Sequence, residues 1–371
     1  MNNYFDSFYD WWKNIDKFLL FLILSLFFLG LFFSLVSTSL IASDKLDTKS
    51  YYFFLKHSAY IVLAIVILII FSFLSQKILT KLSLILFVVA FLSLLLVPFL
   101  GIEVKGSKRW LDLILFPRFQ PVEIVKPFFI VTLSLLLTIQ NKRLNLKYLL
   151  STLLTLPIVI LLIYQPDIGQ TLLISMVWLA LIFISGINIF IFFIFFLIVG
   201  SAVSYLVLFI PKFEYIKIRL FAFLDSSSGN NYQAEKASDA IINGGFFGKG
   251  IGEGTLNSRV PEAHTDYIVS VISEEFGAII VIGILFLYLI FSYKIFRKIN
   301  FLKEDLSKLI LTGCISLILL QTFIHVGVNI RILPTTGMTL PFLSYGGSSL
   351  ISSGIVAGII LNYTSLGVKL E

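Results

Sequence analysis

Long apolar runs are the feature of this sequence that most restricts its fold, and ten of them approach the roughly 20 residues that a helix needs to cross a bilayer. Hydrophobic residues make up 58% and charged residues 13% of the chain, whereas a soluble domain is about half apolar and a quarter charged. This excludes a soluble enzyme with a single anchor and predicts an all-α polytopic membrane protein. The ten expected transmembrane helices cover residues 18–38, 57–75, 80–100, 122–140, 147–164, 168–186, 188–211, 266–293, 308–330 and 345–365.

These helices are expected to form one domain over residues 1–371, with a large extracytoplasmic loop, 212–265, between helices seven and eight. Residues 1–17 precede the first helix as an N-terminal cytoplasmic tail. Tyr4, Phe8, Trp11 and Trp12 recur there at helical spacing, so the tail is either a helix lying in the membrane interface or a loosely ordered segment.

Lysine and arginine set the orientation that we expect. The short segments 76–81, 141–147 and 294–308 are basic, and short basic loops face the cytoplasm. Both termini are therefore predicted to be cytoplasmic. The net charge of +7 lies mostly in loops between apolar runs, so orientation and anionic membrane lipids explain it better than nucleic acid does. With Cys314 as the single cysteine, no disulfide is possible within one chain.

A carboxylate stands where the eighth expected helix begins. Pro261-Glu262-Ala263-His264-Thr265-Asp266 ends the long polar loop and leads into the apolar run 266–293. Because an ionisable group at the membrane edge is costly, Asp266 is a candidate functional residue. The alternative is that Thr265 or Asp266 caps the first turn of that helix.

Other polar residues accompany the outer ends of the expected helices. Glu123 and Lys126 are three residues apart, so they share a helix face and should pair, either as a structural ion pair or in the wall of an outward-facing polar cavity. Asp167 is expected to cap the sixth helix. The ninth expected helix contains Gln321, His325 and Asn329, so that part of it must face protein or water.

Several cations lie in the segments assigned to the outer side of the membrane. Binding of an anionic ligand there would explain their presence. Lys105, Lys108 and Arg109 lie in segment 101–121, and Arg219 lies in the long loop. The glycine-rich stretch 244–254 could bring backbone amides close to a phosphate, or it could be a pliable surface turn. The irregular stretch 334–349, with two prolines and three glycines, must pack on protein or line a cavity. We expect it to lie over the same cavity as Asp266.

Five motifs make this chain resemble the SEDS family (shape, elongation, division and sporulation), which comprises the FtsW, RodA and SpoVE proteins. The resemblance covers nearly the whole chain after about residue 15 and is closer to the FtsW branch. Its motifs are Lys105-Gly106-Ser107-Lys108-Arg109-Trp110, Gln120-Pro121 with Glu123 and Lys126, Gln165-Pro166-Asp167-Ile168-Gly169, Pro261 to Asp266 with Glu274-Glu275, and Pro334 to Ser349.

The resemblance implies a ten-helix fold and an inverting peptidoglycan glycosyltransferase. It implies polymerisation of lipid II on the outer face of the bacterial cytoplasmic membrane, in septal wall synthesis during cell division. It also implies a cognate class B penicillin-binding protein, a transpeptidase, and other divisome proteins as partners. Membrane lipids surround the protein, and nucleic acid is not an expected partner.

The same resemblance assigns roles to particular residues. Asp266 matches the family's essential acid, Glu123 and Lys126 its fourth-helix pair, and Arg219 its loop arginine. The pyrophosphate of lipid II would be stabilised by these outer cations or by a divalent cation, Mg²⁺ or Mn²⁺, with no organic cofactor and no metal site built from protein ligands. The candidate substrate-binding residues are Glu123, Lys126, Arg219, Lys105, Lys108, Arg109, His264 and Ser344.

Three other functions fit parts of the pattern. A flippase for lipid-linked wall precursors, or another secondary transporter, would also have many helices and charges at membrane depth. A purely structural partner of a transpeptidase, or an elongation polymerase of the RodA type, is a further alternative. A transporter needs polar residues along the full depth of the membrane, and here they are expected to cluster in the outer half.

Overall fold

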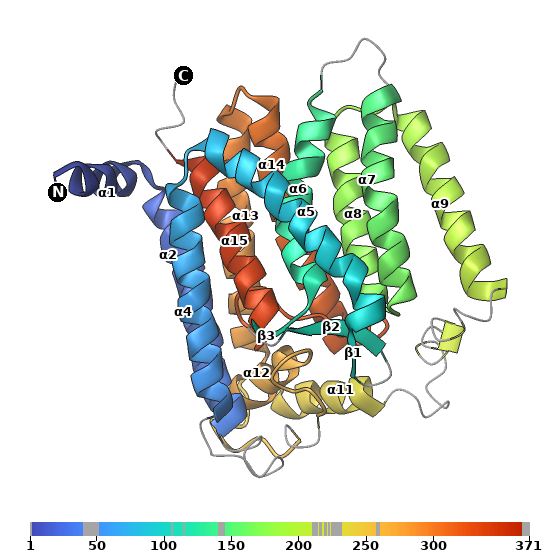
Figure 1. Ribbon diagram of the computed structural model, residues 1–371. Helices are drawn as coiled ribbons and strands as arrows, with labels where there is room; N and C mark the ends of the chain where they lie inside the picture. Colours follow the sequence, from blue (N-terminus) through green and yellow to red (C-terminus); the bar gives the residue numbers. More distant parts are fainter. Residues whose placement is uncertain are drawn as a thin grey trace.

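The computed structural model describes residues 2–39, 52–104, 107–113, 116–139, 145–209, 214, 217–218, 221, 223, 232–256 and 260–365. Helices dominate these residues, and most of them run side by side as a bundle (Figure 1). The helices are α1 (Asn2–Asn14), α2 (Lys17–Ser39), α4 (Tyr52–Phe73), α5 (Gln76–Leu100), α6 (Pro121–Leu137), α7 (Asn145–Tyr164), α8 (Ile168–Ile184), α9 (Ile189–Phe209), α11 (Tyr232–Gly244), α12 (Ile268–Phe276), α13 (Ala278–Phe301), α14 (Asp305–Asn329) and α15 (Gly347–Thr364).

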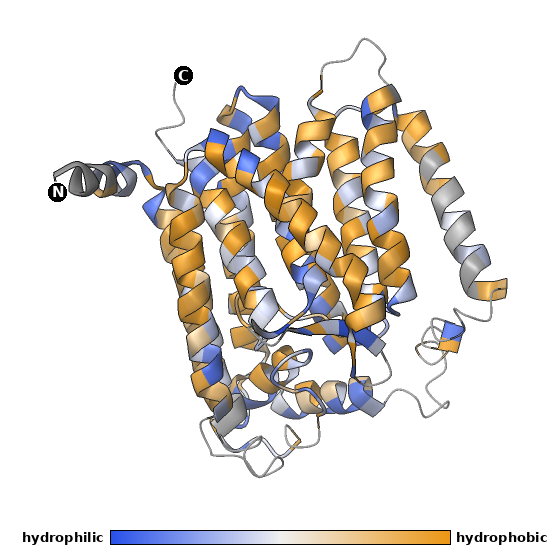
Figure 2. Ribbon diagram, in the orientation of Figure 1, coloured by the Kyte–Doolittle hydropathy of each residue, from blue (hydrophilic) through white to orange (hydrophobic). Residues whose placement is uncertain are grey.

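The predicted fold class, a polytopic helical membrane protein, is confirmed. Within the described residues, seven helices are long and apolar enough to cross a membrane: α2, α4, α5, α7, α13, α14 and α15. Each of the ten predicted spans overlaps a helix, but the number ten stays a prediction. Helix α5 exposes Ile85, Val88, Val89 and Leu92, and exposed apolar residues of this kind are typical of a surface that contacts a membrane. Apolar colour covers most of the bundle helices, whereas hydrophilic residues are most frequent near the two ends (Figure 2).

The eighth predicted span, 266–293, is wrong at its beginning. The short helix α12 ends at Phe276, and α13 starts separately at Ala278. Between them Gly277 has a φ of +84°, a backbone conformation that interrupts a right-handed helix. A Cβ atom on Gly277 would lie 2.2 Å from the carbonyl oxygen of Phe246, so the long polar loop packs directly on this break. Asp266 therefore precedes a short buried helix and is not joined to a membrane helix.

Replacing Gly277 by alanine is expected to destabilise the protein by about 2 kcal/mol or more, because the new methyl group combines a strained φ with a backbone clash. The melting temperature in detergent would measure the change. The readout is a thiol-reactive fluorescent dye, which reaches the buried Cys314 only when the protein unfolds. Gly283→Ala is the matched control, since its Cβ would meet no atom within 4 Å. Equal melting temperatures for the two variants would contradict this role for Gly277.

The two ends of the bundle differ in structure. Helix α1 and the end of α15 lie at one end, and the strands, α11 and α12 lie at the other (Figure 1). Three antiparallel strands, absent from our all-α prediction, form a small sheet in the order β1 (Ile102–Val104), β2 (Ser107–Leu113), β3 (Phe116–Phe119). Strand β2 contacts α5 and α6, and its residue Leu111 is buried.

The N-terminal segment is a helix, as the first of the two interpretations expected. Helix α1 runs across the direction of the bundle (Figure 1). The indole of Trp11 donates a hydrogen bond to the Ser72 hydroxyl at 3.2 Å, while Phe8, Tyr9 and Trp12 are exposed. An amphipathic helix with outward aromatic side chains has the form that interfacial helices take.

Among the long helices of the bundle, α6, α14 and α15 are the most buried. Helix α15 packs closely along α4. At Gly354 the two backbones are so close that a Cβ atom there would lie only 2.4 Å from the backbone oxygen of Ala64. The polar residues predicted to avoid lipid on α14 are all buried: Gln321 is 4%, His325 1% and Asn329 0% exposed. These buried helices carry most of the polar site.

Candidate functional site

Asp266 lies in a tight turn that the backbone of Glu262 holds together. The carbonyl oxygen of Glu262 accepts hydrogen bonds from the amides of Thr265 and Asp266, both at 3.1 Å, and Glu262 itself has a φ of +55°. The side chain of Asn329 on α14 donates to the backbone oxygen of Asp266 at 3.1 Å and accepts from the amide of Ser270 at 3.2 Å. A buried helix therefore fixes the position of the acid.

The capping alternative for this position is not what the structure shows. The N-cap residue of α12 is Tyr267, one position past Asp266, and its side chain makes no capping hydrogen bond. The Thr265 hydroxyl instead donates within the turn, to the carbonyl and carboxylate oxygens of Glu262 at 3.2 Å each. Asp266 is half-buried, so its carboxylate is partly accessible at this end of the bundle.

The irregular stretch 334–349 lies beside Asp266, as expected. Gly337 has a φ of +70°, and a Cβ atom there would lie 3.5 Å from Oδ2 of Asp266. One residue further on, the carbonyl oxygen of Met338 is 2.7 Å from Nδ1 of the buried His325. The Ser344 hydroxyl accepts a hydrogen bond from the amide of Leu340 at 2.8 Å. Ser344, a candidate substrate-binding residue, is thus buried and closes a turn in this stretch.

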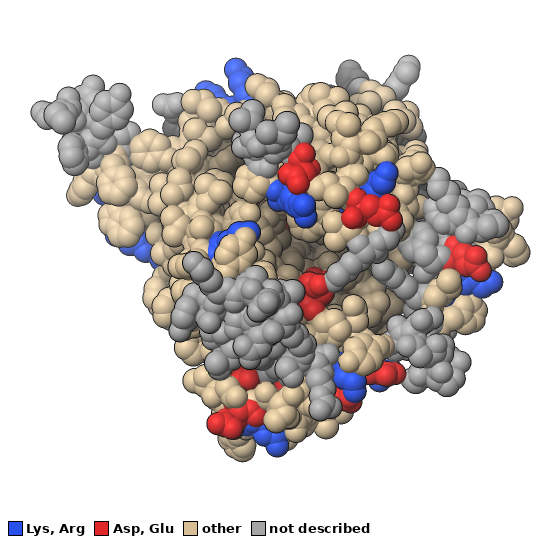
Figure 3. All heavy atoms as spheres, turned by 60° about the horizontal axis from the view of Figure 1, so that its bottom comes forward, with Lys and Arg blue, Asp and Glu red and all other residues tan. Residues whose placement is uncertain are grey.

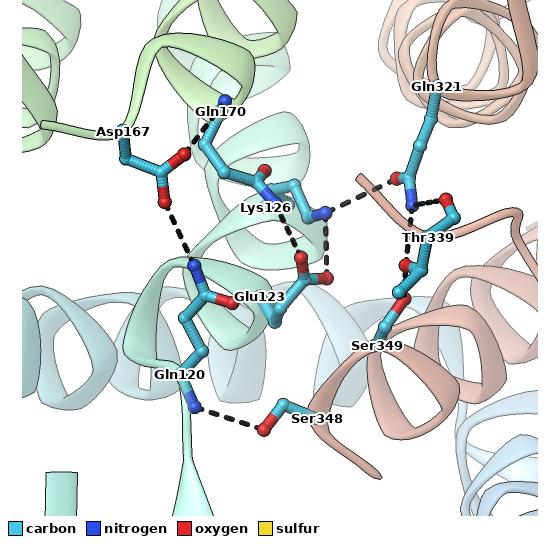
Figure 4. A network of polar contacts seen from close by, with 9 residues as sticks. All are labelled: Gln120, Glu123, Lys126, Asp167, Gln170, Gln321, Thr339, Ser348 and Ser349. Carbon is cyan, nitrogen blue, oxygen red and sulfur yellow. Dashed lines mark hydrogen bonds and ion pairs between the residues drawn. The ribbon is translucent and has the colours of Figure 1, made fainter. Parts of the chain in front are cut away.

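A buried ion pair forms the centre of a polar network, as predicted for Glu123 and Lys126 (Figure 4). Oε2 of Glu123 and Nζ of Lys126 are 2.7 Å apart, and the two residues are only 4% and 1% exposed. Gln170 on α8 donates to Oε1 of Glu123 at 2.7 Å. Lys126 donates to Oε1 of Gln321 at 3.2 Å. Such additional partners are what offset the cost of burying two charges.

The network reaches the stretch that contacts Asp266. The amide group of Gln321 donates to the carbonyl oxygen of Thr339 at 2.9 Å, and the Thr339 hydroxyl is 2.7 Å from that of Ser349 (Figure 4). Thr339 is two residues beyond Gly337, and two residues span at most about 7 Å. The carboxylate of Asp266 and the Glu123–Lys126 pair therefore border the same short stretch of backbone.

A second part of the network surrounds Asp167, the predicted cap of α8. Its Oδ1 accepts from the amide of Gln170 at 3.4 Å, which confirms the cap, and its Oδ2 accepts from the side chain of Gln120 at 3.0 Å. The amide of Gln120 donates to the hydroxyl of Ser348 at 3.0 Å (Figure 4). Burial raises the pKa of the Asp167 carboxyl, and the nearby guanidinium of Arg109 opposes that rise.

The cations proposed for the pyrophosphate differ in what they contact. Successive side chains of a strand point to opposite sides. Accordingly Arg109 turns inward, to Oδ1 of Asp167 at 3.8 Å and to the backbone oxygens of Gln165 and Pro166, whereas Lys108 is exposed. Lys105 and Arg219 lie outside the described residues. On the face at the end of the bundle that holds the strands, acidic and basic side chains are interspersed (Figure 3).

The glycine-rich stretch 244–254 is a structural turn. A Cβ on Gly244 would lie 2.0 Å from the backbone oxygen of Ser273, and the amides of Lys249 and Gly250 donate to the carbonyl oxygens of Glu274 and Glu275. These two amides are therefore occupied by α12. The alternative of a phosphate-binding loop finds no support in this arrangement.

Glu274 and Glu275 hold the long loop in place, a role that sequence reasoning missed. Oε1 of Glu274 accepts from the side chain of Asn243 at 2.9 Å and from the amide of Leu256 at 2.8 Å. The Glu275 carboxylate accepts from the amide of Gly252 at 2.5 Å. The signal for this role was the presence of two adjacent acids in an apolar stretch. A buried carboxylate requires hydrogen-bond donors, and the long loop supplies them here.

His264 packs among aromatic rings at this end. Its imidazole centroid is 5.5 Å from that of Phe53 and 5.6 Å from that of Tyr345, and its backbone oxygen accepts from the amide of Tyr345 at 3.1 Å. The ring is half-buried rather than enclosed. His264 thus ties the turn of Asp266 to the residues just before α15.

Together these features define a polytopic membrane protein with a partly accessible carboxylate beside a buried, charged polar network at one end of its helix bundle. The family described as "Cell cycle protein" (FtsW, RodA and SpoVE) matches residues 17–366. The chain belongs to this family.

Individual relatives extend over nearly the whole chain. It is similar to the probable peptidoglycan glycosyltransferase FtsW of Caulobacter vibrioides, with 31% identity over 95% of this chain and 89% of that protein. It is also similar to the Coxiella burnetii protein of the same name, with 33% identity over 94% of this chain and 95% of the other.

Two solved structures share the fold. A chain of a peptidoglycan synthase complex, described for its structural coordination of polymerization and crosslinking, matches with a TM-score of 0.77 at 28% identity, covering 94% of this chain and 97% of that chain. The rod shape determining protein RodA of Thermus thermophilus matches with a TM-score of 0.67 at 27% identity, covering 94% and 96%.

Proposed function

We propose that this protein is a peptidoglycan glycosyltransferase that polymerises lipid II into glycan strands during septal wall synthesis. The observation that carries the proposal is the half-buried carboxylate of Asp266, which is fixed by Asn329 and borders the stretch that meets the Glu123–Lys126 network. The near full-length relatives named as FtsW support the activity and the septal role. A RodA-type elongation enzyme is the alternative within the family.

Asp266 would act as the general base. Its carboxylate would take the proton from the 4-hydroxyl of the acceptor sugar, and that oxygen would attack the anomeric carbon of the donor with inversion. The bond from that carbon to the pyrophosphate oxygen breaks in the same step, and the lipid pyrophosphate leaves. Hydrogen bonds from Asn329 and within the Glu262 turn hold the base in place, which such a displacement requires.

The departing pyrophosphate needs positive charge nearby. The exposed Lys108 is free of the inward contacts that occupy Arg109, and Lys105 and Arg219 stay candidates on the basis of the family resemblance. The described residues hold no group of three or more His, Cys, Asp or Glu side chains suited to a metal. Mg²⁺ needs only one or two carboxylates beside substrate phosphates, so Glu262 would suit it. When bound, the ion would neutralise charge on the leaving group.

A transpeptidase partner belongs to the same proposal. The structural neighbour with the TM-score of 0.77 is part of a complex that couples polymerization with crosslinking. By that likeness, this chain would work with a class B penicillin-binding protein and with divisome proteins.

The deciding experiment is formation of glycan chains from lipid II by the purified protein, alone and with its transpeptidase, with Mg²⁺, Mn²⁺ or a chelator. Chains that depend on this protein are the expected product. Movement of lipid II across vesicles without polymer would instead identify the transporter alternative.

The orientation is tested by labelling single cysteines with a membrane-impermeant thiol reagent in intact cells, after replacement of Cys314. A cysteine at Lys303 is expected to stay unlabelled and one at Lys236 on α11 to be labelled, because short basic loops face the cytoplasm. Both side chains are accessible enough to react in either orientation. The reverse labelling pattern would place Asp266 on the cytoplasmic side and remove the proposed access to lipid II.

A further inference from the structure

A large cavity lies at the end of the bundle opposite Asp266, where α1 and the end of α15 lie. Its volume is about 1780 Å³, above the roughly 300–1,000 Å³ of a typical small-molecule pocket. The ends of α4, α13 and α15 and the beginnings of α5 and α14 form its wall, together with α1. The mechanism proposed above makes no use of it.

Positive charge dominates the wall of this cavity. Two carboxylates, Asp10 and Glu304, accompany six cationic side chains, which are Lys77 and Lys81 of α5, Lys294, Arg297 and Lys298 of α13, and the following Lys303. An excess of cations on one side of the membrane is enough to orient a membrane protein, and it does not require those cations to share one cavity. Here five of the six come from two helices and converge on one hollow.

Most of these cations have no ion-pair partner among the described residues. Lys298 pairs with Asp16 at 3.2 Å, and Lys294 lies over the ring of Phe18. In the part of the chain that the structure describes, the other four, Lys77, Lys81, Arg297 and Lys303, form no ion pair. Uncompensated like charges on one wall repel one another, and an anion in the cavity would remove that cost.

Backbone N–H groups and a side-chain amide also favour an anion in this cavity. The N-termini of α5 and α14, which begin at Gln76 and Asp305, border the cavity, and helix N-termini favour anions. The side-chain nitrogen of Gln76 is buried and has no hydrogen-bond partner among the described residues. A buried donor of this kind needs an acceptor, and the described residues do not supply one.

Apart from the charged residues, the wall holds both polar and apolar side chains, and some of the apolar ones lie beside the amphipathic helix α1. Trp11, Phe73 and Leu302 line the cavity, and α1 presents Phe8 and Trp12 outward. A free phosphate compound would gain nothing from these surfaces. A lipid has both the anionic group and the apolar chains that this combination suits.

We propose that the cavity binds the phosphate headgroup of an anionic phospholipid. Lys77, Lys81, Arg297 and Lys303 hold the phosphate, the Gln76 amide donates to it, and the apolar side chains beside α1 accommodate the acyl chains. This site is separate from the one assigned to lipid II, so its failure would leave the proposed enzymatic function standing.

Native mass spectrometry of the full-length protein, titrated in detergent with phosphatidylglycerol or phosphatidylcholine, tests the site. The wild type is expected to retain phosphatidylglycerol in preference to phosphatidylcholine. Lys77→Gln/Arg297→Gln is expected to weaken that retention by more than about tenfold, since each basic residue near an anionic headgroup adds about 1 kcal/mol. Both positions are exposed, so the variant should fold.

Lys13→Gln/Lys308→Gln is the matched control, because it removes the same charge at the same end without touching the cavity wall. Retention equal to wild type is expected for it. Equal weakening by both double variants would show attraction to the general surface charge and overturn the site. So would wild-type retention by Lys77→Gln/Arg297→Gln, or displacement of the lipid by millimolar inorganic pyrophosphate, which would identify a soluble anion as the occupant.

Discussion

Replacing Asp266 by asparagine is expected to lower the rate of lipid II polymerisation by about 10²–10⁴, the usual contribution of a general base. Asparagine keeps the size of the side chain but cannot take a proton. The backbone contacts that fix the position, from Asn329 to the Asp266 carbonyl and from the Asp266 amide to Glu262, do not involve the carboxylate. Folding and partner association should therefore persist.

Asp266→Glu is expected to rescue little activity, because the longer side chain misplaces the base by about 1 Å or more. Glycan chain formation is compared at equal amounts of folded, partner-bound protein. Asp239→Asn, which removes an exposed carboxylate on α11 at the same end of the bundle, is the control for a general loss of negative charge. Normal chain formation by Asp266→Asn would remove this residue from the mechanism and favour the transporter or structural alternatives.

Replacing Lys126 by alanine is expected to destabilise the protein by about 3–5 kcal/mol, because Glu123 would keep a buried and uncompensated charge. The loss should appear as a lower melting temperature in the Cys314 thiol assay. It should also lower polymerisation, since the network borders the stretch beside Asp266. The double variant Glu123→Gln/Lys126→Met, which removes both charges, should recover part of the stability.

The surface pair Lys236–Asp239 is a matched control with the same three-residue spacing. Its atoms are 3.2 Å apart, but its side chains are 29% and 50% exposed. Lys236→Ala should cost at most about 0.5 kcal/mol, as exposed pairs do. If Lys126→Ala is no more costly than Lys236→Ala, the pair is not the centre of the polar network.

The sequence is informative wherever a feature depends on neighbours along the chain. Hydropathy locates the membrane helices, the spacing of Glu123 and Lys126 predicts their ion pair, and Asp167 before an apolar run predicts a cap. Comparison with known proteins confirms the family, and the motifs that carried the resemblance are local as well.

Features that depend on distant residues could not be predicted in the same way. A single glycine in an apolar run does not reveal a break, because the break at Gly277 depends on contact with Phe246 of another segment. In the same way, the inward direction of Arg109 depends on Asp167, and the second partner of Lys126 is Gln321, 195 positions further along the chain. The three-stranded sheet was missed because its strands are short and follow an apolar helix.

The separation of Lys126 from Gln321 has a consequence for biosynthesis. At about 5–20 residues per second, a ribosome needs roughly 10–40 s to make the 195 residues between them. Throughout that interval α6 exists without α14. The pair with Glu123, one turn away on the same helix, gives Lys126 a counter-charge that does not depend on α14. Glu123 can therefore neutralise Lys126 in the nascent chain before α14 is made and Gln321 completes the network.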